Sequence, residues 1–169
     1  GTNGIVIKAV GGGGGRGMRV VVNREELAEA YARCKAEAQS AFGMSAVYGE
    51  RLIVRARHIE VQIIGDGNQV IALGERDCTL QRRFQKLIEI APSPVLTAAL
   101  RKQVTDAALK MASHVGYCSL GTFEFLIEED DSGKQLSAVF IEANPRLQVE
   151  HTVTEQVTGV DLVATQLAI

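Results

Sequence analysis

The sequence predicts an α+β fold built from two lobes, a small glycine-loop lobe over residues 1–53 and a larger lobe over residues 54–169. A run of glycines, Gly11–Gly15, joins two short strand-like segments near the start of the chain. Farther along, Arg57–Ile64 alternates apolar and polar residues with the period of a strand, and two apolar segments flank a polar turn at residues 129–133. The larger lobe is therefore expected to hold a mostly antiparallel sheet flanked by helices.

In the first lobe, the predicted order is strand, glycine loop, strand and helix. Ile5–Val10 and Met18–Val22 are expected to pair as a hairpin around the glycines. Asn23 is suited to cap the helix that follows, with Glu26 completing a capping box, and Gly43 is suited to end it. These signals predict a β-β-α unit.

The elements after the first helix are predicted from periodicity and turn residues. Thr97 is expected to cap a helix that ends near Gly116. A helical tail is expected from about Thr152, with an interruption near Gly159. The expected strands are Val47–Val54, Arg57–Ile64, Gln69–Leu73, Leu120–Ile127 and Leu136–Ile141.

The composition is that of a globular chain without a charge bias. The 169 residues are 46% hydrophobic, enough to build a core, and the net charge is −2. This balance favours neither nucleic acid nor a membrane as a partner, and no apolar run has the length of a membrane span. Cys34, Cys78 and Cys118 are odd in number and widely spaced, so we expect reduced thiols in the cytoplasm, or in the mitochondrial matrix of a eukaryote. The abrupt start in a strand predicts a piece of a longer polypeptide.

Two glutamates and an asparagine predict a metal site. Glu124 and Glu142 lie in the strands that flank the polar turn, so antiparallel pairing is expected to place them opposite each other. Both have apolar neighbours, and a half-buried pair of like charges needs a cation. Asn144 would add an oxygen on the same face. We predict Mg²⁺ or Mn²⁺ with phosphate oxygens in its shell, although either glutamate alone is more typical of a solvated strand face.

The glycine loop and Lys8 predict phosphate binding. Glycines let the backbone approach a ligand closely, so that consecutive N–H groups can surround phosphate oxygens. Lys8 precedes the loop and could reach the same phosphates. The pattern is neither a Walker A loop nor a dinucleotide fingerprint, because the glycines join two strands. A flexible hairpin without a ligand is the alternative.

The segment after the last strand predicts an anion site. Arg146 and Gln148 alternate with apolar residues, and Glu150 and His151 follow. A guanidinium, an amide and backbone N–H groups suit a small planar oxyanion such as bicarbonate, and a carboxylate beside them could act as general base. His151 could equally begin a helix and take no part in chemistry.

Two further groups of polar residues are candidates for ligand binding. Residues 81–86 carry three positive charges, which are typical of a solvated edge strand or of a second anion clamp. His58, Glu60 and Gln62 alternate along one predicted strand and therefore share one face of it.

Taken together, these motifs closely resemble the biotin carboxylase component of biotin-dependent carboxylases, which are ATP-grasp enzymes. The resemblance covers essentially the whole chain. Six blocks in order carry it: 8–18, 57–60, 75–78, 81–83, 121–125 and 142–151. It implies that ATP and bicarbonate form carboxyphosphate, whose CO₂ equivalent passes to biotin on a carrier domain.

The resemblance also implies a role for each matching residue. Glu124, Glu142 and Asn144 would bind two Mg²⁺ ions. Glu150 would be the base that deprotonates bicarbonate. The implied nucleotide-binding residues are Lys8, Gly14, Gly15, Glu50, Ile53, His58, Gln81 and Leu126, and the implied bicarbonate-binding residues are Lys86, Arg146, Gln148, Val149 and Glu150, of which Lys86, Arg146 and Glu150 would be catalytic.

The implied partners are a biotin carboxyl carrier domain and a carboxyltransferase, within an oligomeric parent enzyme. The sequence departs from the family pattern at Phe84, where a histidine is usual, and it contains no counterpart of the family's N-terminal subdomain or C-terminal portion. The ATP-grasp fold is thus expected to be incomplete. Two alternatives remain open: another ATP-grasp enzyme, such as a carboxylate–amine ligase or a carbamoyl-phosphate-type synthetase, and an ATP-binding fragment without turnover.

Overall fold

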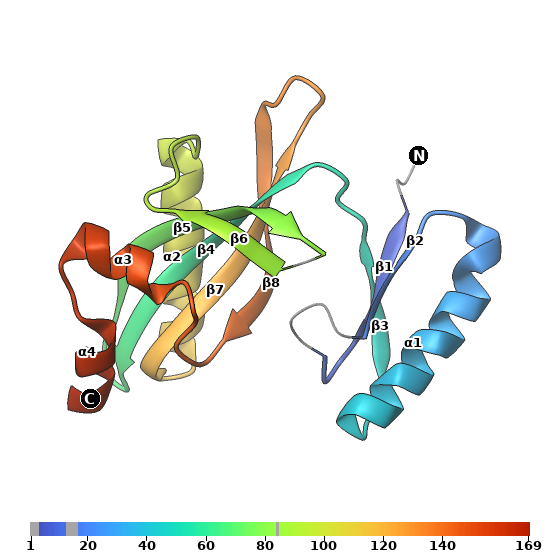
Figure 1. The fold of residues 1–169 in the computed structure, drawn as a ribbon, viewed down its shortest axis with the longest axis horizontal. Coiled ribbons are helices and arrows are strands. Elements are labelled where there is room, and N and C mark those ends of the chain that lie inside the picture. Colours follow the sequence, from blue (N-terminus) through green and yellow to red (C-terminus); the bar gives the residue numbers. More distant parts are fainter. Residues whose placement is uncertain (1–3, 13–16, 84) are drawn as a thin grey trace. The chain divides into compact units, whose positions relative to one another are not determined.

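The structure, a computed structural model, describes residues 4–12, 17–83 and 85–169 (Figure 1). The predicted ligands Gly14 and Gly15, and the departure at Phe84, lie outside these residues. The chain divides into two compact units, residues 1–54 and 55–169. We describe each unit by itself.

Unit 1 is a three-stranded antiparallel sheet with one helix. The strands β1 (Ile5–Ala9), β2 (Met18–Val21) and β3 (Val47–Arg51) are arranged in the order β2-β1-β3. The helix α1 (Leu27–Phe42) packs on the sheet, and the buried residues Ile7, Val21 and Cys34 form the core between them. The strand predicted over 47–54 ends at Arg51 and completes the sheet by pairing with β1.

The predicted capping box at the start of α1 is wrong. A short 3-10 turn, Arg24–Glu26, precedes the helix, and the side chain of Asn23 makes no capping bond to the backbone. The backbone of this turn satisfies its own donor, because the Glu26 N–H donates to the Asn23 carbonyl at 3.1 Å. The Asn23 amide instead donates to the Glu26 carboxylate at 3.0 Å. Gly43 ends the helix as predicted, with a positive φ of 69°.

Unit 2 is built on a five-stranded sheet in the order β6-β5-β4-β7-β8, with antiparallel pairing throughout. The elements of unit 2 are β4 (Ala56–Asp66), β5 (Val70–Arg82), β6 (Gln85–Ile90), α2 (Ala98–His114), β7 (Cys118–Glu129), β8 (Gln135–Asn144), α3 (His151–Thr158) and α4 (Leu162–Ala168).

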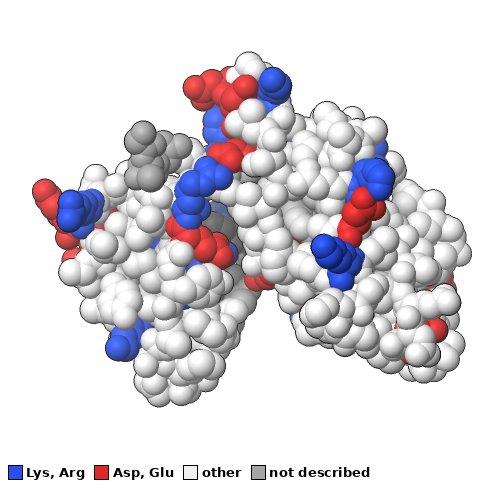
Figure 2. Space-filling view, turned by 180° about the vertical axis from the view of Figure 1, so that it is seen from behind, with Lys and Arg blue, Asp and Glu red and all other residues white. Residues whose placement is uncertain are grey.

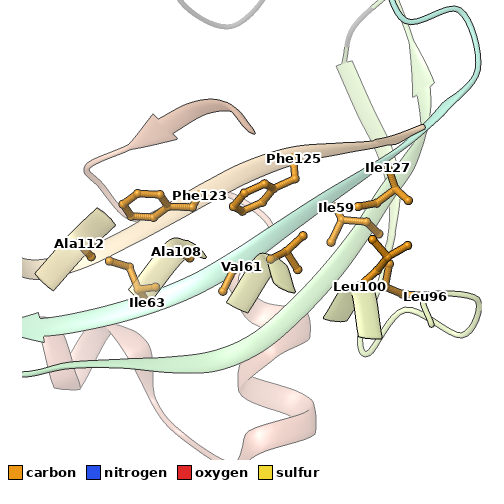
Figure 3. Close-up of a cluster of buried hydrophobic side chains, with 11 residues drawn as sticks. Ile59, Val61, Ile63, Leu96, Leu100, Ala108, Ala112, Phe123, Phe125 and Ile127 are labelled. Carbon is orange, nitrogen blue, oxygen red and sulfur yellow. The ribbon is translucent and has the colours of Figure 1, made fainter. Parts of the chain in front are cut away.

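One face of this sheet is apolar and packs against α2 (Figure 3). Ile59, Val61 and Ile63 alternate along β4 toward the helix, and β7 adds two phenylalanines and an isoleucine. The α2 residues that meet them are Leu100, Val104, Ala108 and Ala112. Thr97 caps the helix as predicted, since its hydroxyl accepts a bond from the Leu100 N–H at 3.3 Å.

The opposite face of the sheet is polar over most of its length. Helix α4 closes one end of it, where Leu162 packs on Ile64 and Leu120. Helix α3 lies against β5 on the same side. The remaining side chains of this face are the candidate site.

The strand predicted over Gln69–Leu73 is much longer in the structure, because β5 runs on to Arg82. Its second half is polar but buried. Glu75 and Asp77 are 4% and 5% exposed on the α2 side, where Glu75 accepts a bond from Arg101 at 2.8 Å. Partners from distant segments, and not apolar alternation, hold this half of the strand in the sheet.

On the face drawn in Figure 2, basic and acidic side chains lie beside one another with wide uncharged areas between them. This pattern agrees with the net charge of −2. No helix among the described residues is long and apolar enough to cross a bilayer.

Candidate functional site

The candidate site lies on the polar face of the sheet in unit 2. His58, Glu60 and Gln62 point to this face from β4, as their alternation predicts, while the residues between them enter the core beneath α2. Glu124 lies directly opposite Glu60 in the β4–β7 pairing. Glu60 and Glu124 are 0% and 3% exposed, so their charges must be compensated inside the protein.

The predicted metal-binding residues lie together. Glu124 and Glu142 are cross-strand partners in the β7–β8 pairing, and the Asn144 amide group donates to both carboxylates, at 3.0 Å and 3.3 Å. Among the described residues, no lysine, arginine or histidine lies within ion-pair distance of Glu142. Within the described part of the chain, the carboxylate of Glu142 thus has no counter-charge, and carboxylate and amide oxygens suit Mg²⁺ or Mn²⁺.

Glu124 has a dense set of partners. The His58 ring nitrogen Nε2 lies 2.6 Å from Oε2 of Glu124, Lys86 Nζ lies 3.1 Å from Oε1, and the Gln148 amide donates to the same Oε1 at 3.2 Å. Burial raises the pKa of Glu124, but the hydrogen bond and charge of His58, together with Lys86 and Gln148, outweigh it and lower the pKa to about 2. Glu124 is therefore an anion at every physiological pH.

Lys86 is the centre of the charged network. Its ammonium group contacts the carboxylates of Glu60 and Glu150 as well as that of Glu124. Burial lowers the pKa of Lys86, but the three carboxylates outweigh burial and raise it above its ordinary value. Burial likewise raises the pKa of Glu150, but the hydrogen bond and charge of Lys86, a backbone hydrogen bond and the charge of Arg76 together outweigh it and lower this pKa. The predicted base is thus ionised and ready to accept a proton.

The other predicted anion ligands differ in their surroundings. Gln148 is 6% exposed, and its carbonyl oxygen Oε1 is buried without a hydrogen-bond partner among the described residues. Arg146 is exposed, with its guanidinium near the Leu147 carbonyl at 3.2 Å and the Asn144 side chain at 3.4 Å. Val149 is 92% exposed. His151 is the first residue of α3, in agreement with the prediction that it could begin a helix.

Two of the residues implied to bind the nucleotide, His58 and Gln81, contact each other. The Gln81 amide nitrogen lies 2.6 Å from Nδ1 of His58 and donates to the Cys78 carbonyl at 2.8 Å. His58 is thereby held between Gln81 on one side and Glu124 on the other. Leu126 is the cross-strand partner of His58 and is half-buried.

In unit 1, Lys8 and Glu50 form an ion pair. Lys8 Nζ lies 2.6 Å from Oε2 of Glu50, across the β1–β3 pairing. Ile53 follows β3 and is half-buried. A lysine already paired with a carboxylate is charged and oriented before any ligand binds.

Sequence reasoning missed Arg76, a fully buried cation on β5. It is 0% exposed and binds Glu60, the centre of the polar face. Its block, residues 75–78, signals only a family resemblance in the sequence. Its partners lie in three other elements, β4, β7 and α3, so no local pattern could reveal them.

Other donor sets on this face also come close together. Two groups, His58 with Glu60 and Glu124, and Glu60 with Cys78 and Glu150, have potential ligand atoms within 4.8 Å of one another. Arg76 and Lys86 already compensate the carboxylates of Glu60 and Glu150. Glu142 differs from these carboxylates, because it has no ion-pair partner among the described residues, and the set formed by Glu124, Glu142 and Asn144 stays the predicted cation site.

Comparison with known proteins agrees with this geometry. The model of the family described as "Carbamoyl-phosphate synthase L chain, ATP binding domain" matches residues 3–169. The chain is 53% identical over 167 residues to pyruvate carboxylase of Bacillus subtilis, covering 98% of this chain and 14% of that protein. It is 54% identical over 165 residues to mitochondrial pyruvate carboxylase of Rattus norvegicus, covering 96% of this chain and 14% of that protein.

Solved structures show the same relationship. A biotin carboxylase of Campylobacter jejuni, in a complex with a nucleotide, superposes with a TM-score of 0.91 at 46% identity, over 98% of this chain and 36% of that one. The biotin carboxylase domain of 2-oxoglutarate carboxylase from Hydrogenobacter thermophilus, in complex with MgADP and bicarbonate, gives a TM-score of 0.88 at 47% identity over the same shares.

The chain therefore belongs to the family of the carbamoyl-phosphate synthase L chain ATP-binding domain, and over nearly its whole length it is similar to pyruvate carboxylases and biotin carboxylases. The predicted α+β, ATP-grasp fold is confirmed. The chain spans about one seventh of the length of the pyruvate carboxylases that it matches, 14%, and 36% of the length of the biotin carboxylase.

Proposed function

We propose that this chain is the ATP-grasp core of a biotin carboxylase, which carboxylates carrier-bound biotin with bicarbonate and ATP by way of carboxyphosphate. The observation that carries the proposal is the contact of one lysine, Lys86, with both Glu124 and Glu150. This contact joins a cation site made of glutamates to an ionised base. An enzyme that makes carboxyphosphate needs both in one place.

The residues of the site fit ATP and a divalent metal. Glu124, Glu142 and Asn144 would hold Mg²⁺ or Mn²⁺, since they offer oxygen donors and Glu142 lacks a counter-charge among the described residues. When bound, the metal neutralises charge on the transferred phosphoryl group. In unit 1, Lys8 would bind phosphate oxygens with the glycine loop, including Gly14 and Gly15. Glu50 and Ile53 would contact the adenine, and His58, Gln81 and Leu126 the nucleoside.

The residues around Glu150 fit bicarbonate. Lys86 would attract the anion, with Arg146 and the backbone amide of Val149 as further donors. The side-chain amide N–H of Gln148 would donate to the anion. Glu150 would accept the hydroxyl proton of bicarbonate, and the oxygen of the resulting carbonate would attack the γ-phosphorus of ATP, so that ADP leaves as carboxyphosphate forms.

The proposal extends to partners outside this chain. A biotin carboxyl carrier domain would deliver the acceptor, and a carboxyltransferase would use the product, in an oligomeric parent enzyme. The compartment would be the cytoplasm, or the mitochondrial matrix as for the rat relative named mitochondrial. A carboxylate–amine ligase or carbamoyl-phosphate-type synthetase is less well supported, because the relatives described above are carboxylases.

A calorimetric titration of MgATP into the chain tests the nucleotide site. Lys8→Ala and Glu142→Gln should each weaken binding by about tenfold or more, because each removes a charged partner of the phosphates or the metal. Lys35→Ala and Asp106→Asn, on the exposed faces of α1 and α2, are the matched controls and should bind as the wild type does. Unchanged binding by both site variants would remove the proposed site.

A further inference from the structure

Arg76 is a buried cation outside the predicted site. Its guanidinium, on β5, is 0% exposed and binds the carboxylate of Glu60. It also donates to the Gln62 side chain at 2.9 Å and to the Thr154 hydroxyl at 2.7 Å, and more weakly to Thr122 at 3.4 Å. A guanidinium presents its donors in a rigid planar fork, so these partners are fixed relative to one another.

Through Glu60, Arg76 is coupled to the proposed bicarbonate site. Arg76 binds one oxygen of the Glu60 carboxylate, and Lys86 binds the other. The carboxylate is therefore held between two cations, one wholly buried and one that also contacts Glu150. The position of the Lys86 ammonium depends on how Glu60 is held.

Through Thr154, Arg76 is coupled to the proposed base from the other side. Glu150 is the N-cap residue of α3, and Thr154 lies four residues on, one turn into the same helix. Thr154 is 2% exposed, and its hydroxyl is the acceptor of the bond from Arg76. This bond joins the first turn of α3 to β5. It thereby also ties Glu150, whose side chain contacts Lys86, to β5.

We propose that Arg76 and Thr154 form a positioning pair that holds Lys86 and Glu150 in register for bicarbonate, an inference that rests on the function proposed above. Arg76 touches neither the proposed substrate residues Gln148 and Arg146 nor the nucleotide residues. It acts on Lys86 through Glu60, and on Glu150 through α3. The pair therefore acts mainly on the use of bicarbonate, and its effect on ATP binding, through the contact of Lys86 with Glu124, is smaller.

The test measures bicarbonate-dependent ATP cleavage by the complete carboxylase, with the two substrates varied separately. Thr154→Val keeps the shape of the side chain and removes the hydroxyl acceptor. It should lower kcat/KM for bicarbonate by about tenfold, the effect of one hydrogen bond to a charged group, with a clearly smaller change in KM for ATP. Thr154→Ser keeps the hydroxyl and should restore most of the loss.

Two further variants separate positioning from simple packing. Thr158→Val removes a hydroxyl of the same helix that bonds the Thr154 carbonyl at 2.8 Å and does not reach Arg76, so it should behave as the wild type. Arg76→Lys should show the same loss as Thr154→Val, and the double variant should lose no more than the larger single loss, because both break one connection.

Several results would overturn the positioning role, or the function on which it rests. An active enzyme in which Thr154→Val keeps the wild-type kcat/KM for bicarbonate overturns the positioning role alone. Equal losses for ATP and bicarbonate, or no rescue by serine, show a general structural role and also overturn it. A wild-type carboxylase without any bicarbonate-dependent ATP cleavage removes the proposed function, and the inference with it.

Discussion

Replacing Lys86 with methionine should destabilise unit 2 by about 3 kcal/mol, at the low end of the cost of removing one partner from a buried ion pair. Lys86 contacts three carboxylates, but two of them keep other partners. Glu60 retains Arg76, and Glu124 retains His58, Asn144 and Gln148. Glu150 loses its one cation among the described residues, so a single carboxylate accounts for most of the cost.

The size of this loss should depend on pH. In the wild type, the pKa of Glu150 is lowered, so its ionised form adds stability above its unfolded pKa. Without Lys86, the largest cause that offsets burial is lost, so the folded pKa of Glu150 should rise and its ionised form should add less stability or oppose folding. The deficit of the variant should therefore shrink as the pH falls from about 8 to about 4, near the ordinary pKa of glutamate.

Urea unfolding, followed by hydrogen exchange at β4 and β7, reports the stability of unit 2 separately from unit 1. Lys102→Met is the matched control, because Lys102 forms an i,i+4 pair with Asp106 and both side chains are exposed. It should cost about 0.5 kcal/mol or less. If the two variants unfold at the same urea concentration, or if the deficit of Lys86→Met is the same at both pH values, the buried network is not what stabilises this face.

Three further predictions concern stability and metal binding. The free energy of unfolding of the metal-free chain should fall by about 3 kcal/mol as the pH falls from 4.5 to 2. The cause is that the pKa of Glu124 is lowered from 4.5 to about 2, and protonation breaks its hydrogen bonds and ion pairs. Acid titration of Glu124→Gln should lack this loss. Gly65→Ala should cost about 3 kcal/mol in urea unfolding, since a Cβ there would lie 2.1 Å from the Tyr117 carbonyl oxygen, whereas Gly49→Ala, with nothing within 4 Å, should cost little. Asn144→Leu should weaken Mn²⁺ binding in the presence of ATP, as seen by paramagnetic relaxation, and equal relaxation in both proteins would exclude Asn144 from the metal site.

The features that local pattern could predict are those set within one or two neighbouring segments. The pairing of Glu124 with Glu142 follows from two apolar strands and the short polar turn between them. Helix α2 follows from Thr97 and the spacing of its apolar residues, and the break in the tail follows from Gly159. In each case, the residues that determine the structure lie close together in the sequence.

The features that could not be predicted depend on distant partners. The polar half of β5 lacks the apolar alternation that predicts a strand. Its partners Arg101 and Glu60, which hold it in the sheet, lie in distant segments. The contacts of Lys86 with Glu60 and Glu150 join residues 26 and 64 positions apart. The Asn23 side chain does not cap α1, because the 3-10 turn Arg24–Glu26 lies between Asn23 and the helix. Charged residues buried by tertiary contacts carry no local signal.

The most direct test of the account follows oxygen from bicarbonate. When the complete carboxylase cleaves ATP in a single turnover with ¹⁸O-labelled bicarbonate, carboxyphosphate formation should transfer one labelled oxygen to the phosphate that is released, and Glu150→Gln should greatly slow the appearance of this label. Phosphate that carries no oxygen from bicarbonate would contradict the claim that this polar face activates bicarbonate with ATP.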